Sequence, residues 1–212
     1  MLFNRHPSLA GMVYQQPTQD EIRKMPQFYR ADLTMVRELG GTHLKKMVEL
    51  IQPSRQWKHY SVDSRCSMLM KGMYPCIPGW HCDDFYRPSR DAQPDLSIIE
   101  EQAPSEHFIM IFGDCSKTSF LDQDVELPHT CTNDRSYYGE CHRLIEEMKL
   151  QEEVLVPGEI WRFSPLTWHK GNPATHAGWR YFIRVTGSNH REPKNEIRTQ
   201  TQVYMTDPFA GW

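Results

Sequence analysis

The sequence predicts a mainly β protein with flanking helices, in which two sheets form a jelly-roll or cupin-like barrel behind an N-terminal layer of helices. Short β-type segments separated by turns fill most of residues 60–73 and 105–186, whereas helical periodicity is confined to residues 32–51 and 138–150. The chain shows no internal repeat, and its 212 residues are enough for one domain that buries roughly 70% of its unfolded surface. We therefore expect a single domain that spans residues 1–212.

The first 60 residues are expected to supply a lead-in and the helical layer. Residues 1–30 carry prolines among scattered polar residues, which predicts an irregular segment lying across the core. From Asp32 to Ile51, apolar residues recur at helical intervals. The pattern breaks near Gly40, and Thr42 can cap a second helix there.

Residues 61–190 are expected to form the barrel core, followed by a C-terminal tail at 191–212. A polar insertion at 122–153 is expected to contain a helix from Tyr138 to Leu150 and to serve as a lid or an edge decoration. The alternating or continuous apolar runs that predict strands lie at residues 60–73, 105–112, 118–121, 153–156, 160–164, 168–169 and 179–186.

Composition excludes several classes of protein. Charged residues make up 24% of the chain and the formal net charge is −3, so the basic excess of a general nucleic-acid binder is absent. No stretch approaches the roughly 18 apolar residues of a membrane span, and the first residues lack the apolar core of a signal peptide. We expect a cytoplasmic protein without a membrane partner, whose six cysteines stay reduced.

A second metal site is an open question at the start of the insertion. His129, Cys131, Cys141 and His142 combine two imidazoles with two thiols, which is a donor set for structural zinc. Their spacing fits no standard finger, and Cys-x-x-Cys is absent. We expect free thiols here.

His81, Asp83 and His169, here called the metal triad, form the strongest candidate site. In a strand, residues two apart point to the same face, so His81 and Asp83 can hold one ion while Cys82 points away. Two histidines and one carboxylate leave coordination positions open, an arrangement typical of non-haem Fe(II) oxygenases, although Zn, Mn, Co or Ni can compete. The structural alternative is a pair of buried histidines satisfied by their neighbours.

Two arginines follow the second histidine. Arg180 and Arg184 lie on one predicted strand, four residues apart, and therefore share a face. Guanidinium groups pair with carboxylates in a planar, bidentate geometry, so a dicarboxylate that binds the metal at one end could form an ion pair at the other. The alternative is a solvated or ion-paired strand face.

Three downstream runs carry a family resemblance together with His81-Cys82-Asp83. They are Pro157-Gly158-Glu159-Ile160-Trp161-Arg162-Phe163, His169-Lys170-Gly171-Asn172-Pro173 and Gly178-Trp179-Arg180-Tyr181. In this order they resemble the C-terminal core of the Fe(II)/2-oxoglutarate-dependent oxygenases, over about residues 67–186. The taurine dioxygenase-like and phytanoyl-CoA hydroxylase-like branches are the nearest. The resemblance implies a double-stranded β-helix, the jelly-roll type of barrel.

The resemblance also implies roles for individual residues. The metal triad would be the catalytic iron ligands, and Arg180 would bind the distal carboxylate of 2-oxoglutarate. Arg184 matches a second arginine of the taurine dioxygenase-like branch, near the keto-acid end of the co-substrate. Thr118 lies where that branch often supplies a hydroxyl to the co-substrate.

The expected activity is hydroxylation of an unidentified substrate, with consumption of O2 and 2-oxoglutarate and release of succinate and CO2. One alternative is a cupin-like metal-binding or sensory domain, or a catalytically silent barrel. Another is a metal-dependent isomerase or a dioxygenase that uses no keto acid. The prime substrate and the oligomeric state stay open in the sequence.

Overall fold

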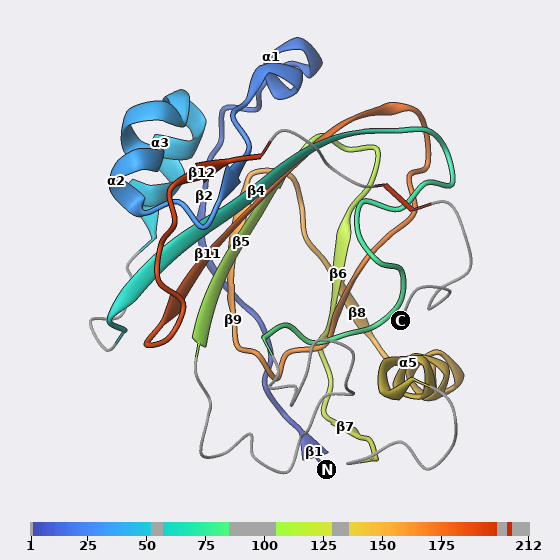
Figure 1. The fold of residues 1–212 in the computed structure, drawn as a ribbon. Helices are drawn as coiled ribbons and strands as arrows, with labels where there is room; N and C mark the ends of the chain where they lie inside the picture. Colours follow the sequence, from blue (N-terminus) through green and yellow to red (C-terminus); the bar gives the residue numbers. More distant parts are fainter. Residues whose placement is uncertain (1, 52–56, 85–104, 129–135, 199–202, 205–212) are drawn as a thin grey trace.

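The structure is a computed structural model that describes residues 2–51, 57–84, 105–128, 136–198 and 203–204. The predicted mainly β fold is confirmed: more residues lie in strands, which form several antiparallel sheets, than in helices, which lie at the periphery of the sheets (Figure 1). No helix in these ranges is long and apolar enough to cross a membrane.

The largest sheet has five strands, and every neighbouring pair in it is antiparallel. In spatial order they are β2 (Ser8–Met12), β9 (Glu159–Phe163), β5 (Ser105–Phe112), β11 (Gly178–Ser188) and β4 (His59–Leu69). Strand β2 belongs to the segment predicted to be an irregular lead-in, and that prediction is wrong. Its backbone pairs with β9 and forms an edge of the sheet.

A second sheet of three strands lies opposite the first in Figure 1. Its order is β10 (His169–Gly171), β6 (Thr118–Leu121) and β8 (Glu152–Val154). Two further pairs are small: β1 (Leu2–Phe3) with β7 (Val125–Glu126), and β12 (Glu196–Ile197) with β3 (Phe28–Tyr29).

Three helices cover the outer face of the large sheet (Figure 1): α1 (Gln19–Lys24), α2 (Leu33–Leu39) and α3 (Gly41–Leu50). The side chain of Asp32 caps α2 by accepting from the Met35 amide. The predicted cap at Thr42 is wrong, because α3 already begins at Gly41 and no side chain caps it. Gly41 has a φ of 71°, a left-handed conformation that glycine adopts readily, so α3 follows α2 directly.

Strict alternation along the central strands separates the core from the site. On β11, Tyr181, Ile183 and Val185 pack into the core beneath the helices. The residues that alternate with them, Arg180, Phe182 and Arg184, line a cavity on the opposite face of the sheet. Because successive side chains in a strand point to opposite faces, one strand serves both the apolar core and the candidate site.

The helix of the insertion is α5 (Tyr137–Met148), close to the predicted range. Ser136 caps it by accepting from the Gly139 amide at 3.0 Å. Its buried face packs with Trp80 and Trp168 in a second apolar cluster. The helix therefore packs against the segment that carries His81, the first residue of the metal triad.

Candidate metal centre

The two histidines of the metal triad are held side by side by their own backbones. His81 and His169 form an isolated antiparallel bridge, in which each amide donates to the other residue's carbonyl at 3.0 Å. Their ring centroids are 4.6 Å apart. A residue near the end of one loop and a residue at the start of β10 therefore lie together, although 88 positions separate them in the chain.

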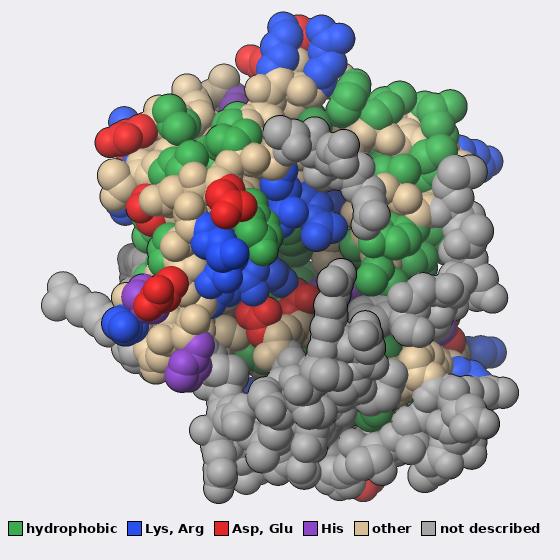
Figure 2. All heavy atoms as spheres, viewed as in Figure 1, with side chains coloured by type: hydrophobic (Ala, Val, Ile, Leu, Met, Phe, Trp, Pro, Cys, Tyr) green, Lys and Arg blue, Asp and Glu red, His purple; other side chains and the backbone are tan. Residues whose placement is uncertain are grey.

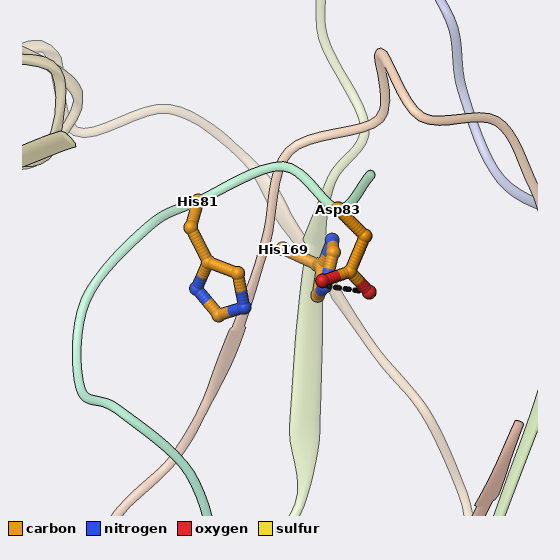
Figure 3. A group of neighbouring side chains, drawn as sticks. All are labelled: His81, Asp83 and His169. Carbon is orange, nitrogen blue, oxygen red and sulfur yellow. Dashed lines mark ion pairs between the residues drawn. The ribbon is translucent and has the colours of Figure 1, made fainter. Parts of the chain in front are cut away.

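Asp83 reaches the histidines without a regular strand. The prediction that His81 and Asp83 occupy one strand is wrong, because the pairing ends at His81 and Asp84 has a φ of 59°. The chain bends there and still brings the Asp83 carboxylate toward His169, with 3.4 Å between Oδ2 and Nε2. Figure 3 shows the three side chains pointing toward one another.

The hydrogen bonds of the two rings set their tautomers. His81 Nδ1 lies 2.9 Å from the Gly79 carbonyl, and His169 Nδ1 lies 3.0 Å from the Thr167 carbonyl. Because a carbonyl only accepts, each Nδ1 donates its proton there, which leaves Nε2 of each ring as the nitrogen available to a metal. Orientation of a ligating histidine through its other nitrogen is usual in metal sites.

Charge states also suit a cation. Burial, followed by the neighbouring His169, lowers the pKa of His81 to about 4, so this ring is neutral at pH 7. Burial opposes ionisation of Asp83, but the Arg184 guanidinium and His169 hold the pKa of that carboxyl well below its usual range. An ionised carboxylate beside neutral imidazole is the protonation state that metal binding requires.

The residues present fit a divalent first-row metal. The three ligand atoms lie within 4.8 Å of one another, and among the described residues this is the one group of at least three such donors. Imidazole nitrogen with carboxylate oxygen suits Fe(II) and its neighbours in the first transition row. Arg184 donates to Asp83, which restrains the carboxylate in the way that outer hydrogen bonds restrain metal ligands.

Helix α5 braces the segment before Asp83. The Tyr138 hydroxyl donates to the Cys82 carbonyl at 2.8 Å, and Trp80 Nε1 donates to Glu146 at 2.8 Å. Lys170 bonds the same carboxylate at 3.0 Å and lies 4.3 Å from the centre of the Trp80 ring. The insertion was expected to be a lid or an edge decoration, but this helix supports the metal triad from behind.

A cavity of about 350 Å³ opens beside the triad, a volume within the roughly 300–1,000 Å³ of small-molecule sites. Phe163 lines it and packs against His169, with ring centroids 5.2 Å apart. The other apolar side chains of the lining exclude water from the same space, and they are Pro75, Ile109 and Phe182.

Arg180 lies in the wall of this cavity and is 5% exposed. Its Nε donates to the Ser116 carbonyl at 3.0 Å, and its NH2 group donates to the Thr118 hydroxyl at 2.9 Å. Neither acceptor is charged, and no carboxylate pairs with Arg180 in the described part of the chain. Burial, with a contribution from Arg65, lowers its pKa to about 10, so the group is still a cation at neutral pH.

The structure thus places all six predicted site residues around one cavity. The metal triad, Arg180, Arg184 and Thr118 line it together. Arg184 contacts the Asp83 carboxylate, and Thr118 contacts the Arg180 guanidinium. Both residues are therefore engaged with other members of the set.

Sequence reasoning missed part of the lining. Asp63 and Arg65 alternate along β4 with the buried residues Val62, Ser64 and Cys66, and that alternation was the available signal. Arg191 and Arg198 come from beyond β11 and reach Asp63 at 2.6 Å and 3.1 Å. No local pattern in the sequence indicates their position, because the chain must fold back before they meet β4.

A buried histidine behind the triad was also missed. His107 on β5 lies 3.1 Å from the Thr186 hydroxyl, 3.2 Å from the Ser105 hydroxyl and 3.5 Å from the Asp84 carboxylate. Burial lowers its pKa to about 4, so it acts as a neutral hydrogen-bonding group. Through Asp84 it supports the residue next to Asp83.

The structure describes only half of the candidate zinc set. His129 and Cys131 lie outside the described residues. Cys141 is a buried, reduced cysteine on α5, and the His142 ring accepts from the Trp80 amide at 3.3 Å. The other described cysteines are reduced as well: Cys66, Cys76, Cys82 and Cys115.

No protein-family model matches this chain, and comparison with curated proteins and with solved structures found no match. The functional conclusion therefore depends on the geometry of the site.

Proposed function

We propose that the protein is a non-haem Fe(II)- and 2-oxoglutarate-dependent oxygenase that hydroxylates its prime substrate. One observation carries the proposal: a triad suited to Fe(II) lines the same cavity as a buried arginine that has no carboxylate partner among the described residues. The two facing sheets support a double-stranded β-helix as the scaffold.

The triad would hold the ferrous ion, which would supply a redox-active centre and open coordination positions for dioxygen chemistry. Residues of the chain do the rest. Arg184 keeps the Asp83 carboxylate ionised and oriented, and the two backbone carbonyls keep both imidazoles in the Nδ1–H tautomer. Arg180 would bind the distal carboxylate of 2-oxoglutarate, with Thr118 fixing its guanidinium plane.

The overall reaction balances without a further reductant. 2-Oxoglutarate is oxidatively decarboxylated to succinate and CO2, and its two electrons together with two from the substrate C–H bond reduce O2. One oxygen atom enters succinate and the other enters the new hydroxyl group. The apolar part of the cavity lining would exclude water from these steps.

Arg180 also separates this proposal from a metal-binding or silent barrel. Burying a guanidinium without an anion costs free energy. A barrel that only stores a metal gains nothing from that cost. A keto acid with a second carboxylate supplies the missing anion and explains the position of Arg180.

The test uses the whole chain loaded anaerobically with Fe(II). Addition of 2-oxoglutarate is expected to produce a weak visible metal-to-ligand charge-transfer band, and addition of O2 is expected to release succinate without added substrate. His169→Ala should lose both signals. His176→Ala is the matched control, because His176 is an exposed imidazole paired with Asp114. Wild-type turnover in His169→Ala, or no band in the unaltered protein, contradicts the proposal.

A further inference from the structure

The cavity holds more positive charge than the proposed reaction uses. Among the described residues, five guanidinium groups line it against two carboxylates, Asp63 and Asp83. Including Asp84, which pairs with Arg191 at 3.1 Å, still leaves a surplus of two positive charges among the described residues. A divalent metal and a doubly charged co-substrate cancel one another, so that surplus would persist in the loaded site.

Asp63 cannot neutralise its neighbours individually. This one carboxylate lies 2.6 Å from Arg191, 3.1 Å from Arg198 and 4.0 Å from Arg184. The buried Nε atoms of Arg184 and Arg191 also find no hydrogen-bond acceptor in the described structure. The charge of these guanidinium groups is therefore only partly neutralised, and some of their N–H groups have no acceptor in the described structure.

Arg65 is the clearest case. Its backbone lies on β4 opposite Phe182, and its half-buried side chain lines the cavity. Its guanidinium makes no hydrogen bond or ion pair with any residue that the structure describes. Instead its charge contributes to lowering the pKa of Arg180 and, after burial, the pKa of Arg198. Arg65 is therefore repelled by these two guanidinium groups and has no compensating partner among the described residues.

Arg198 faces the same space in a fixed orientation. Its Nε donates to the Phe28 carbonyl at 3.1 Å, and its guanidinium carbon lies 4.6 Å from the centre of the Tyr29 ring. On the face shown in Figure 2, Lys and Arg side chains gather near the centre, beside a hollow. Stacking on an aromatic ring pre-organises a guanidinium, which lowers the entropy lost when it binds an anion.

We propose that Arg65 and Arg198, with Arg191 beside them, bind a doubly charged oxyanion of the prime substrate, of the phosphate monoester type. The inference rests on the proposed function, because it assigns this part of the cavity to the molecule that is hydroxylated. A tetrahedral dianion matches the surplus of two charges and offers several oxygens to two planar guanidinium groups. A single carboxylate would leave one charge uncompensated.

The experiment measures binding to the whole chain, loaded with one equivalent of Mn(II), desalted, and saturated with 2-oxoglutarate under anaerobic conditions. Methyl phosphate, inorganic phosphate and acetate are titrated separately by calorimetry. Methyl phosphate is expected to bind, and acetate is expected to bind at least about tenfold more weakly. Binding of inorganic phosphate with exclusion of methyl phosphate would identify a free-ion site and overturn the substrate assignment.

Arg65→Gln is the deciding variant. It should weaken methyl phosphate binding by about tenfold or more, since a hydrogen bond to a charged group is lost. It should also keep or raise the melting temperature, because the native protein loses only repulsion. A role in folding predicts the opposite shift. Arg65→Lys should recover part of the affinity, and Arg23→Gln on α1 is the control, an exposed arginine that pairs with Asp20.

The outcomes separate this inference from the proposed function. If 2-oxoglutarate binds but methyl phosphate does not, the oxyanion site is wrong and the oxygenase proposal stands. If methyl phosphate binds and 2-oxoglutarate does not, the oxygenase proposal fails. If Arg65→Gln weakens 2-oxoglutarate binding instead, Arg65 belongs to the co-substrate site and the inference is overturned.

Discussion

Replacing Arg180 by Gln should remove most of the affinity for 2-oxoglutarate and leave metal binding intact. Arg180 is 5% exposed and its described hydrogen bonds go to neutral oxygens, so its charge is available to a carboxylate. Truncating one partner of a buried, hydrogen-bonded charge pair costs about 2–5 kcal/mol. At about 1.4 kcal/mol for each factor of ten, this is a loss of roughly 30-fold to several thousand-fold in affinity.

The same change should not destabilise the protein that lacks the co-substrate. Burial lowers the pKa of Arg180 to about 10, which shows that the charged form is disfavoured in this wall. A glutamine amide can still donate toward the Ser116 carbonyl or the Thr118 hydroxyl and carries no charge. The free energy of unfolding is therefore expected to stay equal or rise, while affinity falls.

Two measurements check the prediction. Anaerobic titration of the Fe(II)-loaded protein, followed through the charge-transfer band, gives the affinity for 2-oxoglutarate. Urea unfolding of the metal-free protein gives stability. Arg23→Gln is again the control for loss of a guanidinium. A dissociation constant in Arg180→Gln within about threefold of the unaltered protein would correspond to less than 1 kcal/mol and refute the assignment of Arg180.

Two further predictions concern the support of the site. Tyr138→Phe removes the hydrogen bond to the Cys82 carbonyl, which is worth about 1 kcal/mol. Binding of Co(II), measured in competition with a chelator, should therefore weaken severalfold. Tyr137→Phe on the same helix is the control and should not weaken it. Asp63→Asn leaves three arginines without their shared carboxylate and should cost about 3–5 kcal/mol of stability at pH 7. Although burial opposes ionisation of Asp63, Arg184 and Arg191 lower its pKa. Its stabilisation is therefore present above the unfolded pKa of about 3.9 and lost as pH falls through the folded value, and this acid dependence of urea unfolding should be reduced in Asp63→Asn.

Sequence patterns were sufficient where local chemistry decides the structure. A continuous apolar run predicted the strand at 105–112, apolar residues next to a turn predicted the strand at 179–186, and periodicity at 3.6 residues predicted the helix of the insertion. They failed where pairing across the chain decides. Residues 8–12 have no strand-like alternation, and they become the strand β2 because β9 offers them an edge.

In the candidate site, too, the sequence predicted some features and not others. The metal triad and Arg180 were named from spacing and donor chemistry, and the fold brings them to one cavity. The environment of these residues was beyond the sequence: Gly79 and Thr167 fix the tautomers through their carbonyls, and no side-chain pattern marks a carbonyl acceptor. Polar neighbours from distant segments were likewise invisible, because only the tertiary fold places Arg191 and Arg198 against Asp63.

Strand β11 shows why the core and the site constrain each other. One face of the strand places Ile183 and Val185 in the apolar core, and the other places Arg180 and Arg184 in the cavity. A shift of one residue in the register would bury two guanidinium groups beneath the helices and expose the core residues to the cavity. Apolar packing therefore fixes the register, and the register fixes which charges face the metal triad. Because the same register sets Arg65 opposite Phe182 and Asp63 opposite Arg184, the repulsion that Arg65 experiences is built into the sheet, and an anionic ligand is the component that can relieve it.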